Sequence, residues 1–348
     1  MNVDYEHIKR QFYFSVNSHL GFAAWKRPGE HTIHAIYGPV IRKDIHTVEE
    51  NSFVIHPFNP GNGVCCIRKD NVMPDKNAKA QWYVNNSKSY DYSREDFYTL
   101  VNNALNEIQR HKLVKVVVSR QSGMKLPDNF CPVRLFLSAA QKYSHAFVSL
   151  VSTPEYGTWL GATPELFFSV KNSTFEIHSL AGTLLHAGNE NETIVKKNKS
   201  EQERVSEYLR ELLFHLKIDF RESLPEYFTA GELRHFLSRF TGEINKEQII
   251  RLLEELHPTP AIGGLPKNPA LQFLLKNEKH DRQLFGGYLG YFSSYQDFSF
   301  FVNLRCVKVL KDRLQFFAGA GIVDGSIAEL EWDETEKKMD TLRNLLTL

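Results

Sequence analysis

The sequence predicts an α+β protein that folds as one cooperative unit. Apolar, β-branched runs such as residues 115–120 and 146–152 are typical of buried strands. Segments with a 3.6-residue apolar period separate these runs and predict amphipathic helices. No domain-scale linker, low-complexity tract or internal repeat interrupts the chain. We therefore predict a single domain over residues 1–348, with an N-terminal subregion at 1–90 and a catalytic core at 91–348.

Length and composition limit the class of protein. The 348 residues suffice for one large or two ordinary domains, and 25 Phe with 14 Tyr predict an aromatic-rich core. A formal net charge of +1 favours neither nucleic acid nor an anionic membrane surface as a partner. We find no apolar run of about 18 residues, which a membrane span would need. The N-terminus has no apolar signal region, and the cysteines lack metal-ligand spacing, so a reduced, cytoplasmic protein is expected.

The expected elements alternate along the chain. An early helix precedes short strands, and WKRPGEH predicts the tip of a hairpin between the first two of them. The predicted strands are 21–25, 31–37, 52–57, 81–84, 115–120, 146–152, 175–180 and 298–309. The later predicted helices are 93–111, 132–143, 196–216 and 247–256. No catalytic constellation is evident in residues 1–90 or 218–246.

The C-terminal stretch carries the densest candidate chemistry. An apolar run leads into a predicted glycine-rich turn at residues 318–321, where an anion could approach backbone N–H groups. The helix that follows carries Glu331, Glu334 and Lys338 at spacings that place them on one face. Two carboxylates close together suit Mg²⁺. From these residues alone, a solvated helix start that favours acidic residues is the alternative.

Three residues upstream are candidates of the same kind. Lys115 begins a buried strand; it could serve as a base in a partly desolvated cleft or simply reach solvent. Glu165 follows a Gly-Ala-Thr-Pro turn, where apolar neighbours would raise its pKa as a general acid requires, unless it is an ordinary turn glutamate. Glu201 lies on the core-facing stripe of helix 196–216, as a metal ligand or as a first-turn acid.

Substrate contacts are expected from small and polar residues. The small-residue turn Ala181-Gly182-Thr183 could cradle a carboxylate. His257 could donate a hydrogen bond in the site or cap the end of helix 247–256. Arg305 lies in an apolar strand, and a buried arginine needs an anion such as a planar carboxylate.

Taken in order, the motifs resemble those of the chorismate-utilising enzymes. The motifs are KVVVSR, GATPELF, LAGT, KNKSEQERV, LHPTPAIGG, DRQLFGGYLGY, VNLRCVKV, FAGAGI and EWDETEKK. The family includes anthranilate synthase component I, aminodeoxychorismate synthase, isochorismate synthase and salicylate synthase. The resemblance covers residues 90–348. It implies a large α+β domain whose twisted antiparallel sheets form a sandwich flanked by helices, with the active site in a deep cleft.

Within that family, residue choices point to water as the nucleophile. Relatives that add ammonia generally have glutamine at the position of Lys115, whereas water addition needs a base. Ala181 stands where aminodeoxychorismate synthases have a nucleophilic lysine. The segment HPTPA is also similar to isochorismate synthases. The resemblance therefore implies an Mg²⁺-dependent isochorismate synthase.

The implied mechanism assigns a role to each candidate. Lys115 would activate a water that attacks ring C2 of chorismate, and Glu165 would protonate the departing C4 hydroxyl. Mg²⁺ would be held by Glu201 and Glu334, with Glu331 close by, and would bind the ring carboxylate. The implied substrate-binding residues are Ala181, Gly182, Thr183, His257, Arg305, Gly319, Ala320, Gly321 and Lys338.

The chain departs from the family pattern at Gln202, where relatives usually have histidine, and at Leu184 and Leu185, which follow the LAGT motif where an arginine often lies. The N-terminal part is also shorter than in many relatives. These departures concern rate and fine specificity, not the reaction class. The rivals are a salicylate synthase, which also eliminates pyruvate, and a catalytically silent homologue. By association with similar stand-alone chains we expect a role in menaquinone rather than siderophore synthesis, and a monomer.

Overall fold

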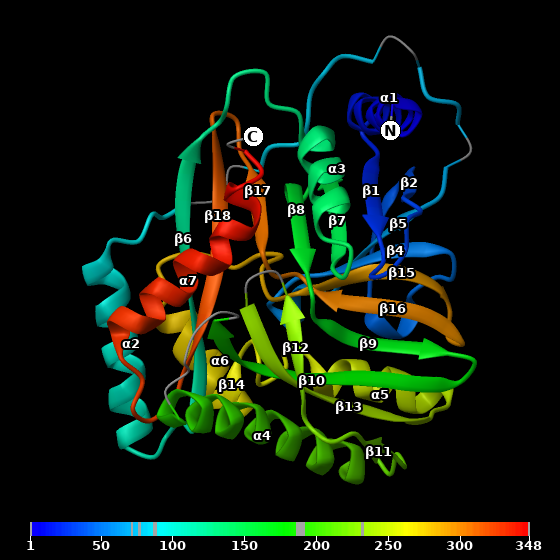
Figure 1. Ribbon diagram of the computed structural model, residues 1–348. Helices are drawn as coiled ribbons and strands as arrows, with labels where there is room; N and C mark the ends of the chain where they lie inside the picture. Colours follow the sequence, from blue (N-terminus) through cyan, green and yellow to red (C-terminus); the bar gives the residue numbers. More distant parts are fainter. Residues whose placement is uncertain are drawn as a thin grey trace.

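Two antiparallel sheets form the frame of the protein (Figure 1). The computed structural model describes residues 2–70, 72–75, 78–85, 89–185, 192–230 and 233–346. The first sheet has the strand order β14 (Gly264–Leu265), β6 (Lys115–Lys125), β18 (Arg313–Ile322), β17 (Cys306–Val309), β8 (Gly157–Thr163), β7 (Phe147–Thr153), β1 (Gly21–Lys26) and β2 (His34–Gly38).

The second sheet crosses below the first in Figure 1. Its order is β11 (Arg221–Glu222), β13 (Leu233–Glu243), β10 (Thr174–Leu185), β9 (Leu166–Lys171), β16 (Asp297–Val302), β15 (Tyr288–Ser294), β4 (Ser52–His56), β5 (Val64–Arg68) and β3 (Val40–Lys43), and β12 (Glu226–Ala230) pairs with β13. Strands β1 and β2 thus belong to the first sheet and β3, β4 and β5 to the second. The N-terminal subregion therefore helps to complete both sheets.

Helices cover the outer faces of the two sheets. They are α1 (Asn2–Asn17), α2 (Arg94–Gln109), α3 (Pro132–Lys142), α4 (Glu192–His215), α5 (Lys246–Leu256), α6 (Lys267–Asn277) and α7 (Ala328–Arg343), with short 3₁₀ turns at Ile45–Thr47 and Pro60–Asn62. In Figure 1, α1 and α3 lie over β1, β7 and β8, α7 crosses β18 and β6, and α4 runs along β10. The structure therefore confirms the predicted α+β sandwich flanked by helices.

An aromatic core lies between the sheets. It gathers Trp25, Trp159 and Phe317 from the first sheet with Phe53 and Phe301 from the second. These are large apolar side chains, and their burial is the main force that holds two sheets face to face.

Two local predictions about strands are wrong. Residues 81–84 form no strand. Residues 298–309 are not one strand, because the chain leaves the second sheet after β16 and enters the first sheet at β17. Arg305 lies in this crossover with a φ of 47°. A continuous apolar run carries no signal for a change of sheet, since both strands are buried.

The small-residue segments predicted as turns lie within strands. Residues 318–321 continue β18 and pair with β6. In β10 the register shifts between Ala181 and Thr183, where Gly182 has a φ of 70°. A Cβ at Gly182 would lie 2.6 Å from the carbonyl oxygen of Asn198, so glycine is required there for both conformation and space.

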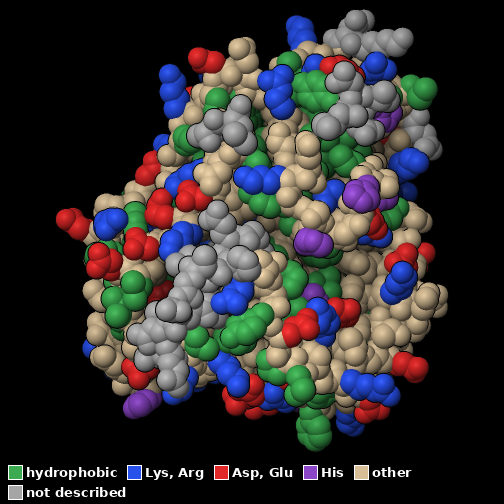
Figure 2. Space-filling model, viewed as in Figure 1, with side chains coloured by type: hydrophobic (Ala, Val, Ile, Leu, Met, Phe, Trp, Pro, Cys, Tyr) green, Lys and Arg blue, Asp and Glu red, His purple; other side chains and the backbone are tan. Residues whose placement is uncertain are grey.

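On the face seen in Figure 2, cationic and anionic side chains are interspersed, and no area of a single sign stands out. This agrees with the near-zero net charge. Within the described ranges, no helix is both long enough and apolar enough to cross a bilayer. The four cysteines are buried, and none forms a disulfide.

Candidate active site

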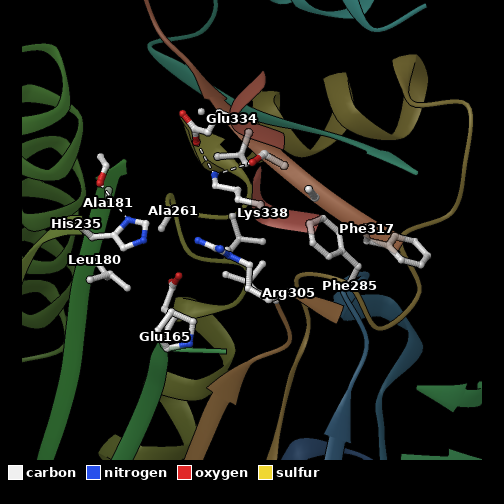
Figure 3. A pocket seen from close by; sticks show the side chains of 18 of the residues that line it. Glu165, Leu180, Ala181, His235, Ala261, Phe285, Arg305, Phe317, Glu334 and Lys338 are labelled. Carbon is white, nitrogen blue, oxygen red and sulfur yellow. Dashed lines mark hydrogen bonds and ion pairs between the residues drawn. The ribbon is translucent and has the colours of Figure 1, made fainter. Parts of the chain in front are cut away.

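A cavity opens where the two sheets, α4 and α7 converge (Figure 3). It encloses about 760 Å³ of space, part of it open to solvent. Its polar or charged lining side chains are Glu165, Glu201, His235, Arg282, Arg305, Glu334 and Lys338. Most of the charged residues singled out in the sequence therefore face one space, although they are far apart along the chain.

Glu165 lies at the point where the chain crosses from β8 to β9. Its carbonyl oxygen accepts a hydrogen bond of 3.1 Å from the N–H of Val302, so this crossover lies beside the one that contains Arg305. The side chain is buried, and burial raises the pKa of its carboxyl to about 7, against the opposing effect of Lys115, Lys338 and Arg305. The carboxyl can therefore be protonated near neutral pH, as a general acid requires.

Lys115 is fully buried at the start of β6, which rules out the solvent-exposed alternative. Its Nζ lies 2.8 Å from Oε1 of Glu201, at an angle outside that of a hydrogen bond. A Cβ at Gly321 would overlap this Glu201 oxygen and lie 3.3 Å from Lys115 Cε. The absence of a side chain at Gly321 thus leaves room for the lysine and the glutamate to meet beside the cavity.

Arg305 and Lys338 supply positive charge to the cavity. Arg305 Nη1 donates a 3.2 Å hydrogen bond to the hydroxyl of Thr341, and burial lowers the pKa of its guanidinium to about 10. Lys338 Nζ donates to the carbonyl oxygen of Gly319 at 2.8 Å and lies 2.5 Å from Oε1 of Glu334. Figure 3 shows the guanidinium of Arg305 above Glu165 and the ammonium of Lys338 farther up, against Glu334. Together they can hold an anionic ligand.

The sequence did not single out His235, because no catalytic constellation is evident in residues 218–246. Its Nδ1 lies 3.1 Å from the carbonyl oxygen of Gly182. Since a carbonyl only accepts, Nδ1 carries the proton and Nε2, which is buried and has no partner among the described atoms, is an acceptor. Burial, with a smaller effect of Arg305 and Lys338, lowers the pKa of the imidazole to about 3. His235 therefore stays neutral and can accept a hydrogen bond from a ligand hydroxyl.

One signal could have revealed His235. It is a lone histidine in the strand LRHFLSRFTGE, which pairs with the strand that carries the LAGT motif, and His235 stands opposite Thr183. A sequence cannot show that pairing without a known register.

Two carboxylates, Glu201 and Glu334, line the same cavity. Glu331 is buried, but it does not line the cavity. Among the described residues, no three His, Cys, Asp or Glu side chains gather in the manner of a complete metal site. Two carboxylates suit Mg²⁺, because this cation usually keeps several water ligands and takes further oxygen ligands from the substrate.

The other candidates divide into two groups. Ala181, Gly182, Gly319 and Gly321 line the cavity. The side chain of Ala320 points to the opposite face of β18, into the core, because neighbouring strand residues alternate. Thr183 lies in β10, and its side chain is outside the described residues.

His257 does not line the cavity. It forms the C-cap of α5, and its Nε2 lies 3.0 and 3.1 Å from the carbonyl oxygens of Pro57 and Phe58. The pKa of this imidazole lies well below its ordinary value, and burial is the main cause. Residue 257 is thus the C-cap of α5 by position only, because its imidazole contacts carbonyl oxygens in the segment that follows β4. Nearby, Ala261 and Ile262 bring the HPTPAIGG segment to the cavity wall.

The arrangement suits an anionic, hydroxylated ligand. Cationic groups, a protonatable acid, a neutral acceptor and two carboxylates surround one cavity, and a buried lysine lies beside it. Such a set can bind carboxylates, exchange protons with a hydroxyl group and hold a divalent cation.

Comparison with known proteins agrees with this chemistry. The family described as chorismate binding enzyme matches residues 66–347. Isochorismate synthase EntC of Escherichia coli (strain K12) is 34% identical over 202 residues, which are 55% of this chain and 52% of that protein. The chain thus spans about half the length of the first curated relatives it matches.

Solved structures share the fold. DhbC of Bacillus anthracis gives a TM-score of 0.78 at 21% identity, with 99% of this chain and all of that chain covered. MenF, the menaquinone-specific isochorismate synthase of Escherichia coli, gives 0.76 at 19% identity, with 96% and 90% covered.

Proposed function

The chain belongs to the chorismate-binding enzyme family, and on that premise we propose that it is an isochorismate synthase. The observation that carries the proposal is the buried Glu165 carboxyl, whose pKa of about 7 lets it act as an acid, facing Arg305 and Lys338 across one cavity. The presence of a lysine at position 115 favours water over ammonia as the nucleophile.

The proposed reaction replaces the C4 hydroxyl group of chorismate by a hydroxyl group from water at C2, with no net change in composition. A water adds to C2 of chorismate and gives one proton to the amine of Lys115. The ring double bonds shift, and the C4 hydroxyl leaves as water with a proton from Glu165. The reverse reaction exchanges the acid and base roles of the two residues.

Binding of the substrate is assigned to the cationic and small residues. Chorismate has two carboxylates, which Arg305 and Lys338 can neutralise. Backbone groups of Gly319 and Gly321 border the same space, and Nε2 of His235 can accept a hydrogen bond from a ring hydroxyl. These contacts fix the ring relative to Lys115 and Glu165, as an SN2″-type step requires.

We propose Mg²⁺ as the cofactor, held by the carboxylates of Glu201 and Glu334. When bound, the ion would draw in the ring carboxylate and offset negative charge. Lys338 lies 2.5 Å from Oε1 of Glu334 and so balances part of its charge. On the resemblance stated above, we assign the product to menaquinone synthesis. Deletion of the gene should then abolish menaquinone and leave catechol siderophores unchanged.

The test is product analysis with purified protein. Chorismate should be converted to a mixture of chorismate and isochorismate, only with Mg²⁺ and not with chelator. The Glu165→Gln variant is the matched control and should form product about 10²- to 10⁴-fold more slowly. Salicylate with an equal amount of pyruvate would instead assign the chain to the salicylate synthases. No Mg²⁺-dependent product from wild-type protein would refute the proposed function.

A further inference from the structure

A flank of α7 that does not line the cavity is fastened to β6 through Arg120. The Arg120 side chain is 1% exposed, and its Nε donates a 2.7 Å hydrogen bond to the hydroxyl of Thr335. Its Nη2 pairs with the carboxylate of Glu336, and its guanidinium lies 3.6 Å from the ring centroid of Trp332. One side chain of the strand therefore contacts three residues within two turns of the helix.

A second link joins the same two elements. Glu336 also accepts a 2.7 Å hydrogen bond from Nη1 of Arg343, and Nη2 of Arg343 donates to the hydroxyl of Ser122 at 2.7 Å. Ser122 follows Arg120 on β6. The carboxylate of Glu336 is thus shared by two arginines, and α7 is held to the strand at its middle and near its end.

The start of α7 has no side-chain cap. Its N-cap residue, Ile327, makes no side-chain cap hydrogen bond, and Ile327 and Leu330 are 56% and 55% exposed. An uncapped helix start loses backbone hydrogen bonds easily. The contacts of Arg120 with Trp332, Thr335 and Glu336 are therefore an important restraint on the segment that carries Glu334.

We propose that Arg120 is a positioning residue that sets the place of α7, and hence of Glu334 and Lys338, relative to Lys115. Lys115 and Arg120 both lie on β6. Strand β18 pairs with β6 from Val116 to Lys125. Strand β6 therefore carries both the buried Lys115 and the arginine that holds α7. Lysine could keep the charge at position 120 but could not reproduce the planar stack and fork of hydrogen bonds.

The proposal rests on the proposed function for its kinetic readout, but it has a second readout that needs no substrate. Arg120→Met removes the hydrogen bonds and the charge of Arg120. Arg120→Lys keeps the charge and much of the side-chain volume. Lys26→Met is the matched control, because Lys26 is a buried cation on β1 that donates to the carbonyl oxygens of Tyr143 and Ser144. For each variant the experiment measures the melting temperature, hydrogen exchange of α7 amides, and the Mg²⁺ half-saturation and KM for chorismate.

In the Arg120→Met variant, hydrogen exchange of the amides at residues 328–338 should be faster than in the Lys26→Met variant. The Mg²⁺ half-saturation of Arg120→Met should rise, or its kcat/KM should fall, by roughly 10- to 100-fold. Arg120→Lys should fall between wild type and Arg120→Met, and Lys26→Met should change only the melting temperature. Unchanged α7 exchange in both Arg120 variants would overturn the proposal, whatever the reaction. If wild-type protein turns over no chorismate, the proposed function fails, and the exchange result still decides the positioning role.

Discussion

Replacing Glu165 by glutamine should raise stability above neutral pH while stopping the reaction. Burial raises the pKa of the Glu165 carboxyl from 4.5 to about 7. At about 1.4 kcal/mol per pKa unit, this corresponds to a cost of about 3 kcal/mol for holding the carboxylate form in the folded protein. Glutamine has nearly the same shape and carries no charge, so the variant avoids that cost.

The sign of the effect follows from where the proton is bound. Below pH 4.5, both the folded and the unfolded chain carry the proton on Glu165, and wild type and variant should differ little through this group. Between pH 4.5 and about 7, only the folded state keeps the proton, so wild-type stability falls as pH rises. Above about pH 7 the folded protein holds the buried carboxylate, and the advantage of the variant should be complete.

The assay is urea unfolding of wild type and Glu165→Gln at pH 5, 7 and 9. The difference in unfolding free energy should grow with pH toward about 3 kcal/mol. Glu247→Gln, at an exposed glutamate in the first turn of α5, is the control and should show no such trend. Turnover should fall by about 10²- to 10⁴-fold in Glu165→Gln. Parallel stabilities of wild type and variant from pH 5 to 9 would refute the assignment of a raised pKa.

Further substitutions test the remaining groups. Lys115→Gln should abolish water addition and allow ammonia addition at high ammonium; retained hydration, measured by product chromatography, would remove Lys115 as the base. Glu334→Ala should weaken Mg²⁺ binding measured by calorimetry, and unchanged affinity would contradict its role as a ligand. Gly321→Ala should displace Glu201 and lower Mg²⁺ affinity, because its Cβ would overlap a Glu201 oxygen. Normal metal affinity in that variant would show that Glu201 does not need the space.

Motifs and periodicity predicted the elements well where the signal is local. The helix over residues 93–111 appears as α2, whose start is fixed by a capping box between Ser93 and Asp96. The hairpin at WKRPGEH joins β1 and β2. These features depend on neighbouring residues, so a single sequence carries them.

Features that depend on distant contacts were not predictable in this way. Arg305 lies between strands of different sheets, and the buried apolar run around it looks the same on both sides of the crossover. His235 lines the cavity only because β13 pairs with β10 in a particular register. Conversely, the sequence brought forward His257, whose imidazole instead contacts the carbonyls of Pro57 and Phe58.

The most direct test of the account is the origin of the new hydroxyl oxygen. Purified protein would be incubated with chorismate and Mg²⁺ in ¹⁸O-labelled water, and isochorismate would be analysed by mass spectrometry at early times. Attack of water at C2 with loss of the C4 hydroxyl predicts one ¹⁸O atom in each isochorismate molecule. Unlabelled isochorismate would mean that the original hydroxyl migrates within the ring, and would contradict the roles assigned to Lys115 and Glu165.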